Sequence, residues 1–556
     1  MRLGALVQPA APLFAAALVI ALIAAAPAAA ATYTVTDLGD SGVAGDGSLR
    51  GEIRAANAHE GADTIAFAPG LSGTLTISGS GLVIQGPTAI EGPGPGAVSV
   101  RQISGGHRVI QVKLTEPGAV SIAGLTLAGG ETTGPGGDLE FDAEGEPGSL
   151  EVVDCVITEG SAEDYGGGLS SFGAPLTLRD SAVVENEGDS GGGIWAGGHD
   201  MPFTIEGSTI ADNESVSAGG GLNGEVEHGG HDAIVDSTFA GNKSEDEGGG
   251  AYFSLGSETS ITVANSTVTE NIADGGGGGF EFNTDEGVQA TVEDSTIAGN
   301  HGGSLLGEAG GVQESGAVPQ AMVDTIVADN TGGQPDIFGE WAASFSLIGN
   351  PSGAKISEAL PGSDLVGVEP NLAPLAANGG PTETMMPAAS SPVINKGGGS
   401  LATDQRGDPR PSIFPGVALS GAPGADGADI GAVELQAPAV ASTPSTSGAG
   451  AKSGPRVKVR CPKRAGHGGC RFLLRAVSAK PRRTKGRGGH VRLIRPKPES
   501  AAVRIRLKAG RSTILTLTPK PRFAAKLDRA RQILVREVET IGDATHTTYR
   551  RLKVIG

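Results

Sequence analysis

The sequence predicts an all-β protein: a right-handed parallel β-helix with three strands per coil, followed by a small C-terminal antiparallel β-sandwich domain. Three observations lead to this prediction. A short phrase recurs within residues 113–330, apolar residues keep a fixed register around it, and glycine runs return at the same interval. Repeats of such a period indicate a stacked architecture in which each unit packs on its neighbours.

The recurring phrase occurs eight times. Its clearest copies read Asp/Asn/Gly-Ser-Thr-apolar-x-x-Asn, and we call its first residue the anchor. Successive anchors are 26 to 30 residues apart, which is enough chain for one coil of short strands and turns. The eight anchors are Gly124, Asp154, Asp180, Gly207, Asp236, Asn265, Asp294 and Asp324.

Apolar residues hold fixed positions on both sides of each anchor. One lies two residues before it and one lies three residues after it, and all sixteen such positions are apolar. Inward-facing residues of a continuous strand share one parity, whereas these two positions differ in parity, so the chain must bend at the anchor. Asp, Asn and Gly tolerate such a corner, through left-handed geometry or local side-chain hydrogen bonds.

Two further turns complete the coil. Glycine runs at 166–168, 191–193, 219–221, 248–250 and 275–279 each open the next strand. An asparagine six residues after most anchors marks another corner, where stacked amides are expected to bond from coil to coil. The asparagines of this predicted ladder are Asn186, Asn213, Asn242, Asn271, Asn300 and Asn330.

Two columns of side chains are expected to face outward. Threonines two residues after the anchor read as a solvated strand face, with a flat ligand-binding face as the alternative. Carboxylates five residues after the anchor read as a solvated edge that blocks lateral strand pairing, and weak Ca²⁺ binding there is the one cofactor hypothesis. The columns are Thr209, Thr238, Thr267 and Thr296, and Glu185, Asp212, Glu270 and Asp329.

Residues 1–31 read as a secretory signal peptide. Arg2 precedes an apolar run centred on residues 14–26, and alanines at 28–31 supply a small-residue cleavage site. A retained membrane anchor is the alternative, but the small-residue end favours cleavage. We therefore expect an exported protein, extracellular or at the cell surface, with no transmembrane segment after signal removal.

Residues 32–112 read as the N-terminal cap and first coils. Leu49, Ile53 and Ala56 recur at helical spacing, which predicts a short amphipathic helix over 48–58. Such a cap is needed because a bare terminal coil exposes strand edges and an apolar core.

A family resemblance lies in the same stretch. Residues 47–78, GSLRGEIRAANAHEGADTIAFAPGLSGTLTIS, resemble the CSLREA module found at the amino terminus of exported bacterial β-helix proteins. The sequence departs from that module twice. Gly47 stands in place of the cysteine, and Gly51 is inserted between the arginine and the glutamate.

Residues 331–436 follow the last clear repeat and read as closing coils. The phrases NGGPTET, SSPVIN, DQRGDPRP and GADIGAVE, in this order between 378 and 434, resemble the choice-of-anchor Q domain of related exported proteins. Arg406 and Arg410 lie among carboxylates, and we expect Arg–carboxylate pairs to pin the closing coils. An anion or sugar site is the alternative.

Residues 437–455 form a Pro/Ser/Gly/Ala linker. Beyond it, residues 456–556 alternate apolar and basic side chains, which predicts antiparallel strands, with a segment near 523–539 that is expected to begin as a short helix. Residues 451–556 contain 29 Lys and Arg against 5 Asp and Glu, whereas residues 1–450 contain 12 against 57, a net charge of −45. The chain is therefore strongly dipolar.

The three cysteines have separate roles. Cys461 and Cys470 are nine residues apart in an exported domain, which favours a local disulfide. A metal pair with His467 is the alternative, although two cysteines and one histidine make a poor zinc signature. Cys155 directly follows an anchor and is interpreted as a buried free thiol.

The charge pattern weighs against two enzyme classes. Between Lys113 and Lys355 the only basic residues are Arg179 and Lys243, and a rod of net charge −45 repels polyanions, so a Ca²⁺-dependent lyase acting on acidic sugars is disfavoured. The Asn-Thr-Asp at 283–285 resembles one of the polygalacturonase phrases, but the Asp-Asp phrase occurs nowhere in the sequence, and Arg-Ile-Arg at 504–506 lies in the other domain. We assign no catalytic residue and no metal ligand.

The favoured function is a non-catalytic, exported cell-envelope or secreted scaffold for surface display, adhesion or carbohydrate binding. A glycoside hydrolase on the same scaffold is the alternative. Expected partners are polysaccharides or, through the basic domain, anionic envelope polymers. Export argues against a specific nucleic acid, although a basic surface binds phosphates. The oligomeric state is left open.

Overall fold

The computed structural model describes residues 30–437 apart from 144–146, 306, 317 and 400, and the strands that lie beyond residue 455. The chain divides into two compact units, Met1–Val440 and Ala441–Gly556. The predicted signal peptide lies almost entirely outside the described residues.

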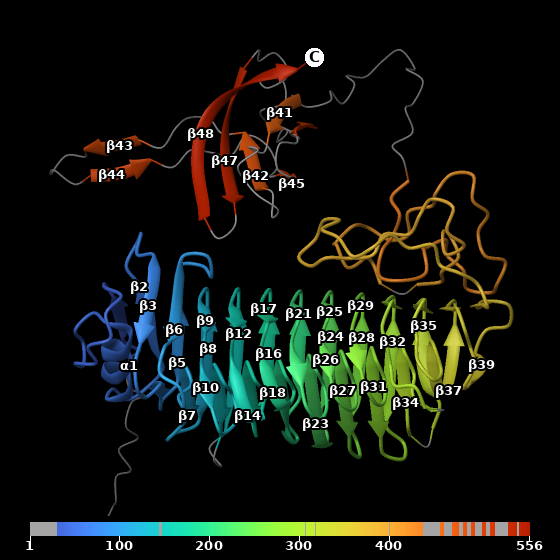
Figure 1. Ribbon diagram of the computed structural model, residues 1–556, viewed down its shortest axis with the longest axis horizontal. Helices are drawn as coiled ribbons and strands as arrows, with labels where there is room; N and C mark the ends of the chain where they lie inside the picture. The colour runs from blue at the N-terminus through green and yellow to red at the C-terminus, as the bar shows by residue number, and fades with distance from the viewer. Residues whose placement is uncertain are drawn as a thin grey trace, which may run out of the picture. The chain divides into compact units, whose positions relative to one another are not determined.

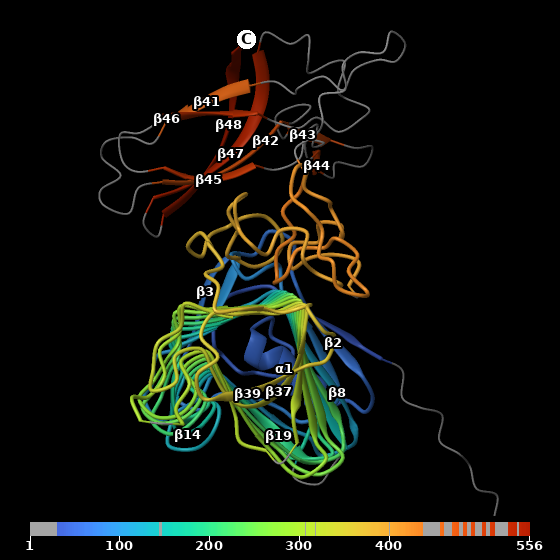
Figure 2. The same cartoon turned by 90° about the vertical axis from the view of Figure 1, so that its right-hand side faces the viewer.

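The first unit is a parallel β-helix, which confirms the predicted fold class (Figure 1). Each coil runs through sheet A, turns at the anchor into sheet B, and returns through sheet C; every strand pairs in parallel with its counterparts one coil away. Figure 2 looks along the stack and shows the walls of the coil around the interior, which buried apolar side chains fill. The sheet A strands are β1 (Thr32–Val35), β2 (Asp63–Phe67), β5 (Thr88–Glu91), β8 (Gly118–Ala123), β12 (Gly148–Val153), β16 (Leu176–Arg179), β20 (Phe203–Glu206), β24 (His231–Val235), β28 (Ser260–Ala264), β32 (Gln289–Glu293), β35 (Gln320–Val323), β37 (Ile337–Ser344) and β39 (Ala354–Glu358).

The other walls differ in strand length. In the repeat region the sheet B strands are three residues long, because corners close both of their ends. The sheet B strands are β3 (Gly73–Ile77), β6 (Val98–Gln102), β9 (Thr126–Ala128), β13 (Val156–Thr158), β17 (Ala182–Val184), β21 (Thr209–Ala211), β25 (Thr238–Ala240), β29 (Thr267–Thr269), β33 (Thr296–Ala298), β36 (Ile326–Ala328), β38 (Leu347–Ile348) and β40 (Leu365–Val366). The sheet C strands are β4 (Leu82–Ile84), β7 (Ile110–Lys113), β11 (Leu139–Asp142), β15 (Leu169–Phe172), β19 (Ile194–His199), β23 (Leu222–His228), β27 (Ala251–Leu255), β31 (Phe280–Thr284) and β34 (Val312–Glu314).

A fourth, short sheet lies between sheets B and C and is absent from the sequence prediction. This sheet D has strands of two to five residues that precede the glycine runs. Its strands are β10 (Glu131–Thr132), β14 (Ser161–Tyr165), β18 (Glu187–Ser190), β22 (Glu214–Ser215), β26 (Lys243–Ser244) and β30 (Ile272–Ala273).

The predicted apolar register forms the core. All sixteen residues that flank the anchors are 0% exposed. All eight anchors have positive φ, from 46° at Asp324 to 67° at Gly124, so the bend is a left-handed corner between sheets A and B. The parity change predicted this corner correctly.

The asparagines form one continuous ladder inside the corner between sheets B and D. Each Nδ2 donates to the Oδ1 of the next asparagine at 2.9 Å, from Asn186 through to Asn330. Asn330 Nδ2 then donates to Asp336 Oδ1 at 3.0 Å, which ends the ladder on a carboxylate. Each side chain also satisfies a backbone carbonyl of the preceding coil, as Asn242 does with Ile210 O at 2.9 Å.

A second ladder, which was not predicted from the sequence, lies at the anchor corner and is built from the repeated serine. From Cys155 to Thr325, the backbone N–H of the residue after each anchor donates to a hydroxyl in the next coil, as between Ser208 and Ser237 at 3.2 Å. The same hydroxyl donates to the carbonyl two residues earlier, as Ser237 Oγ does to Val235 O at 2.8 Å. Cys155 occupies the first rung as a buried free thiol, which matches the prediction.

The predicted N-terminal helix is confirmed as α1 (Leu49–Asn57), and Leu49, Ile53 and Ala56 are its buried face. Ser48 caps it by accepting from Gly51 N at 3.1 Å, and Glu52 accepts from Gly47 N, one residue before the cap, at 2.6 Å. A Cβ on Gly51 would lie 2.4 Å from the carbonyl oxygen of Val43. The glycine that departs from the resembled module is therefore required by close packing here.

The predicted closing coils are only partly right. The coils continue through β37, β38 and β39 and end at β40 (Leu365–Val366). Residues 367–437, which we call the cover segment, have few strand pairings and fold back along the anchor corner (Figures 1 and 2). This reversal could not be predicted, because the cover segment has no period to match against the coils.

The threonine column faces outward from sheet B, but it is not solvated. Thr238 Oγ1 donates to Glu383 O at 2.6 Å, Thr267 Oγ1 donates to Gln405 Oε1 at 2.6 Å, and Thr296 Oγ1 accepts from Ala432 N at 3.0 Å. Thr238, Thr267 and Thr296 are buried, and Thr209 is half-buried. The predicted solvated face is therefore wrong for these three threonines, because the cover segment lies on it.

The second unit is antiparallel throughout its described strands. One sheet has the order β45-β42-β47-β48-β41-β46, and β43 pairs with β44 separately. Residues 532–541 form a strand, so a helix over the whole predicted segment is excluded. The strands are β41 (Arg456–Arg460), β42 (Cys470–Ala476), β43 (Arg482–Lys485), β44 (Val491–Ile494), β45 (Val503–Leu507), β46 (Ser512–Thr516), β47 (Gln532–Ile541) and β48 (Ala544–Ile555).

Removing one interior rung of the asparagine ladder should destabilise the β-helix. Asn242→Ala leaves the backbone N–H and the Nδ2 of Asn213 without their shared acceptor in a buried site. We expect the free energy of unfolding to fall by about 3 kcal/mol, since each orphaned buried group costs about 1–3 kcal/mol. Urea unfolding measures this change. Asn283→Ala, at an exposed asparagine, is the control and should shift the midpoint little.

Candidate functional site

The outer face of sheet C is the candidate site. Along each strand, apolar side chains point into the core and the alternate ones point outward, so one outward position is repeated in register from coil to coil. We call this row the sheet C column. Its members are Gln111, Glu140, Ser170, Trp195, Asn223, Tyr252, Glu281 and Gln313.

The sheet C column is polar and aromatic, yet much of it is shielded from solvent. Ser170, Asn223 and Glu281 are all buried although they lie on the outside of the coil. The loops around sheet D project beside this wall (Figure 2). The result is a sheltered row of hydrogen-bonding groups along the axis of the helix.

Three aromatic rings meet near the middle of the column, around Ser170 and Trp195. The Trp195 ring lies 5.5 Å from Tyr165 at an interplanar angle of 31°, and 5.8 Å from Phe172 at 24°. Tyr165 and Phe172 are 43% and 57% exposed, whereas Trp195 is 5% exposed. They line a hollow of about 250 Å³ together with Pro135, Glu140 and other residues. Exposed stacked rings are unusual here because aromatic residues make up only 4% of the chain.

Two buried polar atoms of the column have no hydrogen-bond partner: Trp195 Nε1 and Asn223 Oδ1. Buried polar atoms are nearly always paired, so an unpaired donor and an unpaired acceptor in adjacent coils indicate a place for a ligand's own polar groups. The Asn223 Nδ2, by contrast, donates to Ser190 Oγ at 2.6 Å and to Glu225 Oε1 at 2.8 Å. Those bonds fix the orientation of the amide.

Glu140 supplies a carboxylate beside the rings. Its Oε2 lies 2.9 Å from Arg108 Nη1 and accepts from Gln111 Nε2 at 2.7 Å. Burial raises the pKa of Glu140, and the nearby Arg108 guanidinium opposes that shift. The carboxylate is thus held in place by two partners.

Glu281 is the second carboxylate of the column. Its Oε2 accepts from Gly277 N at 2.8 Å and its Oε1 accepts from Gln313 Nε2 at 2.7 Å. Burial raises the pKa of Glu281 to about 7, and the charge of Glu247 raises it further. Tyr252, its neighbour in the column, accepts at its hydroxyl from Asn283 Nδ2 at 3.1 Å.

The acidic column predicted from the sequence does not lie on sheet C but at the corner that follows sheet B. Glu185, Asp212, Glu270 and Asp329 are exposed, with φ between 56° and 60°, so they sit at the left-handed corner after sheet B and not on a strand edge. The three-residue length of the sheet B strands puts this position in the turn. Asp329 has a carboxylate neighbour, Glu369 of the cover segment, and burial and that neighbour raise its pKa to about 6.

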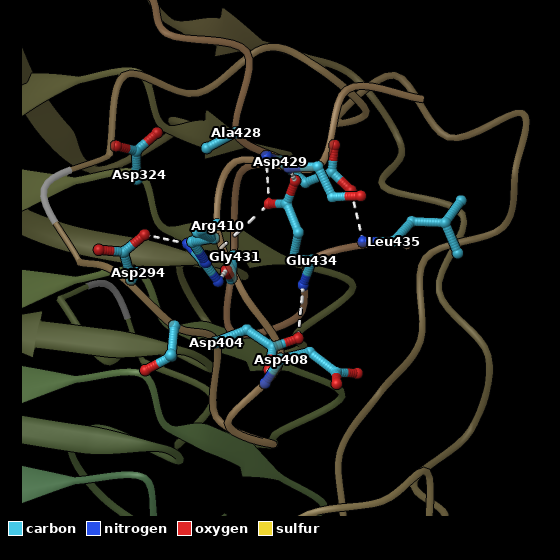
Figure 3. Close-up of polar contacts among 12 residues, drawn as sticks. Asp294, Asp324, Asp404, Asp408, Arg410, Ala428, Asp429, Gly431, Glu434 and Leu435 are labelled. Carbon is cyan, nitrogen blue, oxygen red and sulfur yellow. Dashed lines mark hydrogen bonds and ion pairs between the residues drawn. The ribbon is translucent and has the colours of Figure 1, made fainter. Parts of the chain in front are cut away.

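Arg406 and Arg410 both belong to the cover segment and pair with carboxylates. Figure 3 shows Arg410 beside Asp294. Arg410 pairs with the anchor Asp294, donates to Gly431 O at 2.6 Å, and lies 4.0 Å from Glu434. Arg406 pairs with Asp404 at 2.6 Å. The pairing agrees with a structural role for both arginines, since Arg410 joins the cover segment to a coil of the β-helix.

Burial raises the pKa of three carboxyl groups in this cluster above the ordinary aspartate range. The pKa of Asp324 rises to about 8, with a further contribution from the charge of Asp294. The pKa of Asp429 rises to about 7, and that of Asp294 rises to about 6 despite the opposing charge of Arg410.

Cys461 lies outside the described residues, so the disulfide with Cys470 stays a prediction.

No protein-family model matches the sequence, and no curated protein matches it. Among solved structures, pectate lyase Pel9A is similar, with a TM-score of 0.44 at 15% identity over 73% of this chain and 96% of that chain. The A-modules of the mannuronan C-5 epimerases AlgE6 and AlgE4 of Azotobacter vinelandii have TM-scores of 0.29, at 15% and 13% identity. They cover 57% and 56% of this chain, and 93% and 89% of their own. Likenesses this distant carry no argument about activity.

The raised pKa values predict how stability depends on pH. An unfolded aspartate titrates near 3.9, whereas Asp324 titrates near 8 when folded, so the folded state binds the extra proton between these values. The free energy of unfolding should therefore fall as the pH rises from about 4 to about 8. Urea unfolding at several pH values measures this slope. Asp324→Asn should flatten it, and Asp212→Asn, at an exposed corner, should not; an unchanged slope in Asp324→Asn would contradict the prediction.

Proposed function

We propose that this protein is an exported, non-catalytic carbohydrate-binding scaffold that holds a polysaccharide chain along the sheet C column. The observation that carries the proposal is the contact of Tyr165 and Phe172 with the Trp195 ring, next to the unpaired Trp195 Nε1 and Asn223 Oδ1. Flat apolar rings fit the C–H faces of sugars, and a few fixed polar groups orient the ligand.

The shape of the site favours an extended chain over a small molecule. Successive coils are about 4.8 Å apart, so a linear polymer lying along the axis meets a new member of the column at every step. Rings from two neighbouring coils would contact the middle of the bound chain, and the amide and carboxylate oxygens of the coils on either side would accept hydrogen bonds from its hydroxyl groups.

The charge selects the kind of polysaccharide. Residues 1–450 carry a net charge of −45, and Glu140 and Glu281 lie within the column itself. A polyanion would be repelled by this field. Neutral or amino-sugar polymers are therefore the proposed ligands.

Glycoside hydrolysis is the second candidate, and the pKa of about 7 at Glu281 favours it, since a general acid works best near the ambient pH. The geometry weighs against it. Both Glu281 oxygens accept hydrogen bonds from the protein and the residue is 3% exposed, so its proton has no open route to a glycosidic oxygen. Reducing-end release that is lost in Glu281→Gln would favour the enzyme.

We further propose that the protein is exported by its first 31 residues and retained at the cell envelope by its basic domain. The sequence features that support this are the signal-like segment, the resemblances to the CSLREA module and the choice-of-anchor Q domain, and the 29 basic residues after position 450. In the described residues, no helix is both long enough and apolar enough to cross a membrane.

Phe172→Ala should weaken polysaccharide binding by about tenfold, because it removes an exposed ring of the stack at little cost to folding. Isothermal titration with oligosaccharides of β-glucan, xylan, mannan and chitin measures the affinity. Leu305→Ala, at an apolar residue that is 68% exposed elsewhere on the coils, is the control and should bind normally. Wild-type protein that binds none of these polymers, or equal binding by Phe172→Ala, would count against the proposal.

Deleting residues 456–556 should release the protein from the envelope into the medium, since the basic domain would dock on anionic polymers. Immunoblotting of cell and medium fractions measures the distribution. A washing series at increasing salt is the companion test, because exposed ion pairs are screened. Unchanged retention of the truncated protein would rule out this docking role.

A further inference from the structure

A second cluster lies where sheet C turns into sheet A. His199 ends β19 and His228 ends β23, and the two residues are paired in register in adjacent coils. Asp200 directly follows His199, and Glu258 lies in the same turn one coil further on. Three successive coils thus place two imidazoles and two carboxylates side by side.

The donor atoms are close to metal-binding spacing. His199 Nδ1 and His228 Nδ1 lie 3.8 and 3.7 Å from Asp200 Oδ1, and His228 Nδ1 lies 4.0 Å from Glu258 Oε2. Ligand atoms of His199, Asp200 and His228 all lie within 4.8 Å of one another. In tetrahedral zinc sites, bond lengths of about 2.0–2.2 Å put ligand atoms about 3.3 Å apart. Small side-chain rotations would close the difference.

One atom of the cluster lacks a partner. His228 Nδ1 is buried and has no hydrogen-bond partner, although it faces the two carboxylates. A Cβ on Gly229 would lie 2.4 Å from Asp200 Oδ1, so the glycine is what lets this carboxylate approach the imidazole.

The surrounding charge also favours a cation. The two basic residues between Lys113 and Lys355 are engaged elsewhere: Arg179 with Glu151 and Lys243 with Glu214. Ammonium or guanidinium groups from that stretch therefore do not neutralise Asp200 and Glu258.

We propose that His199, Asp200 and His228 bind a Zn²⁺ ion, with Glu258 as a fourth ligand. Imidazole nitrogen suits Zn²⁺, whereas Ca²⁺ takes oxygen ligands and six to eight of them. The bound ion would cross-link three coils at the end of the sheet C strands. The sequence analysis assigned no metal ligand, since the four residues belong to three different repeats and resemble no metal-binding spacing.

The test is titration of the untagged full-length protein with Zn²⁺ alone, by calorimetry and by thermal unfolding. We expect binding of one ion at this site and a higher unfolding midpoint in Zn²⁺, with no effect of Ca²⁺. The double variant His199→Asn/His228→Asn should bind Zn²⁺ about 100-fold more weakly. His301→Asn, at another exposed histidine of the coils, is the matched control and should bind as the wild type does.

Binding of Co²⁺, followed by its absorption spectrum, would distinguish this site from one formed by the cysteines of the basic domain. A Co²⁺ complex without thiolate-to-metal charge-transfer absorption, lost in the double variant, supports the proposal. Thiolate absorption that persists in the double variant, or no Zn²⁺ binding by the wild type, overturns it. Because all these side chains are at the surface or half-exposed, circular dichroism of the double variant should match the wild type, and a misfolded double variant is replaced by Asp200→Asn.

Discussion

The left-handed corner at the anchor is the constraint on which the rest of the β-helix depends. All eight anchors turn there, and six of them are aspartate or asparagine, the residues other than glycine that reach this conformation at least cost. Because every coil bends at the same point, the residue after the anchor and the residue six after it fall in line. The serine and asparagine ladders are the result of that alignment.

Those two ladders explain how a polar phrase can sit inside the coil. Ser237 and Asn242 are both fully buried, and each gives and receives hydrogen bonds in the neighbouring coils. A buried polar group is tolerated when it is paired, and a regular stack pairs each one with a copy of itself. The repeat therefore specifies its own register without relying on apolar shape alone.

Structure could be predicted best from the sequence at positions where the same residue type recurs once in every coil. The corner, the core and the asparagine ladder repeat the same residue type, so they could be predicted. The sheet C column repeats a position but not a chemistry: Ser170, Trp195 and Asn223 are register neighbours with nothing in common. The cover segment was also beyond prediction, since its contacts join Thr382 to Asp236 across 146 residues. The cover segment thus lies on β25, β29 and β33 of sheet B, whereas the proposed ligand would lie on sheet C.

The cover segment also constrains the number of coils in the part of the β-helix that it contacts. It contacts four consecutive anchors, through Thr382 on Asp236, Thr403 on Asn265, Arg410 on Asp294 and Gly398 on Asp324. A duplication or loss of one coil between the first and the last of these anchors would leave both ladders continuous and the core intact. It would nevertheless displace every later contact of the cover segment by one coil. The number of coils between Asp236 and Asp324 is therefore fixed by a segment outside the repeat, although the two ladders alone would allow that number to change.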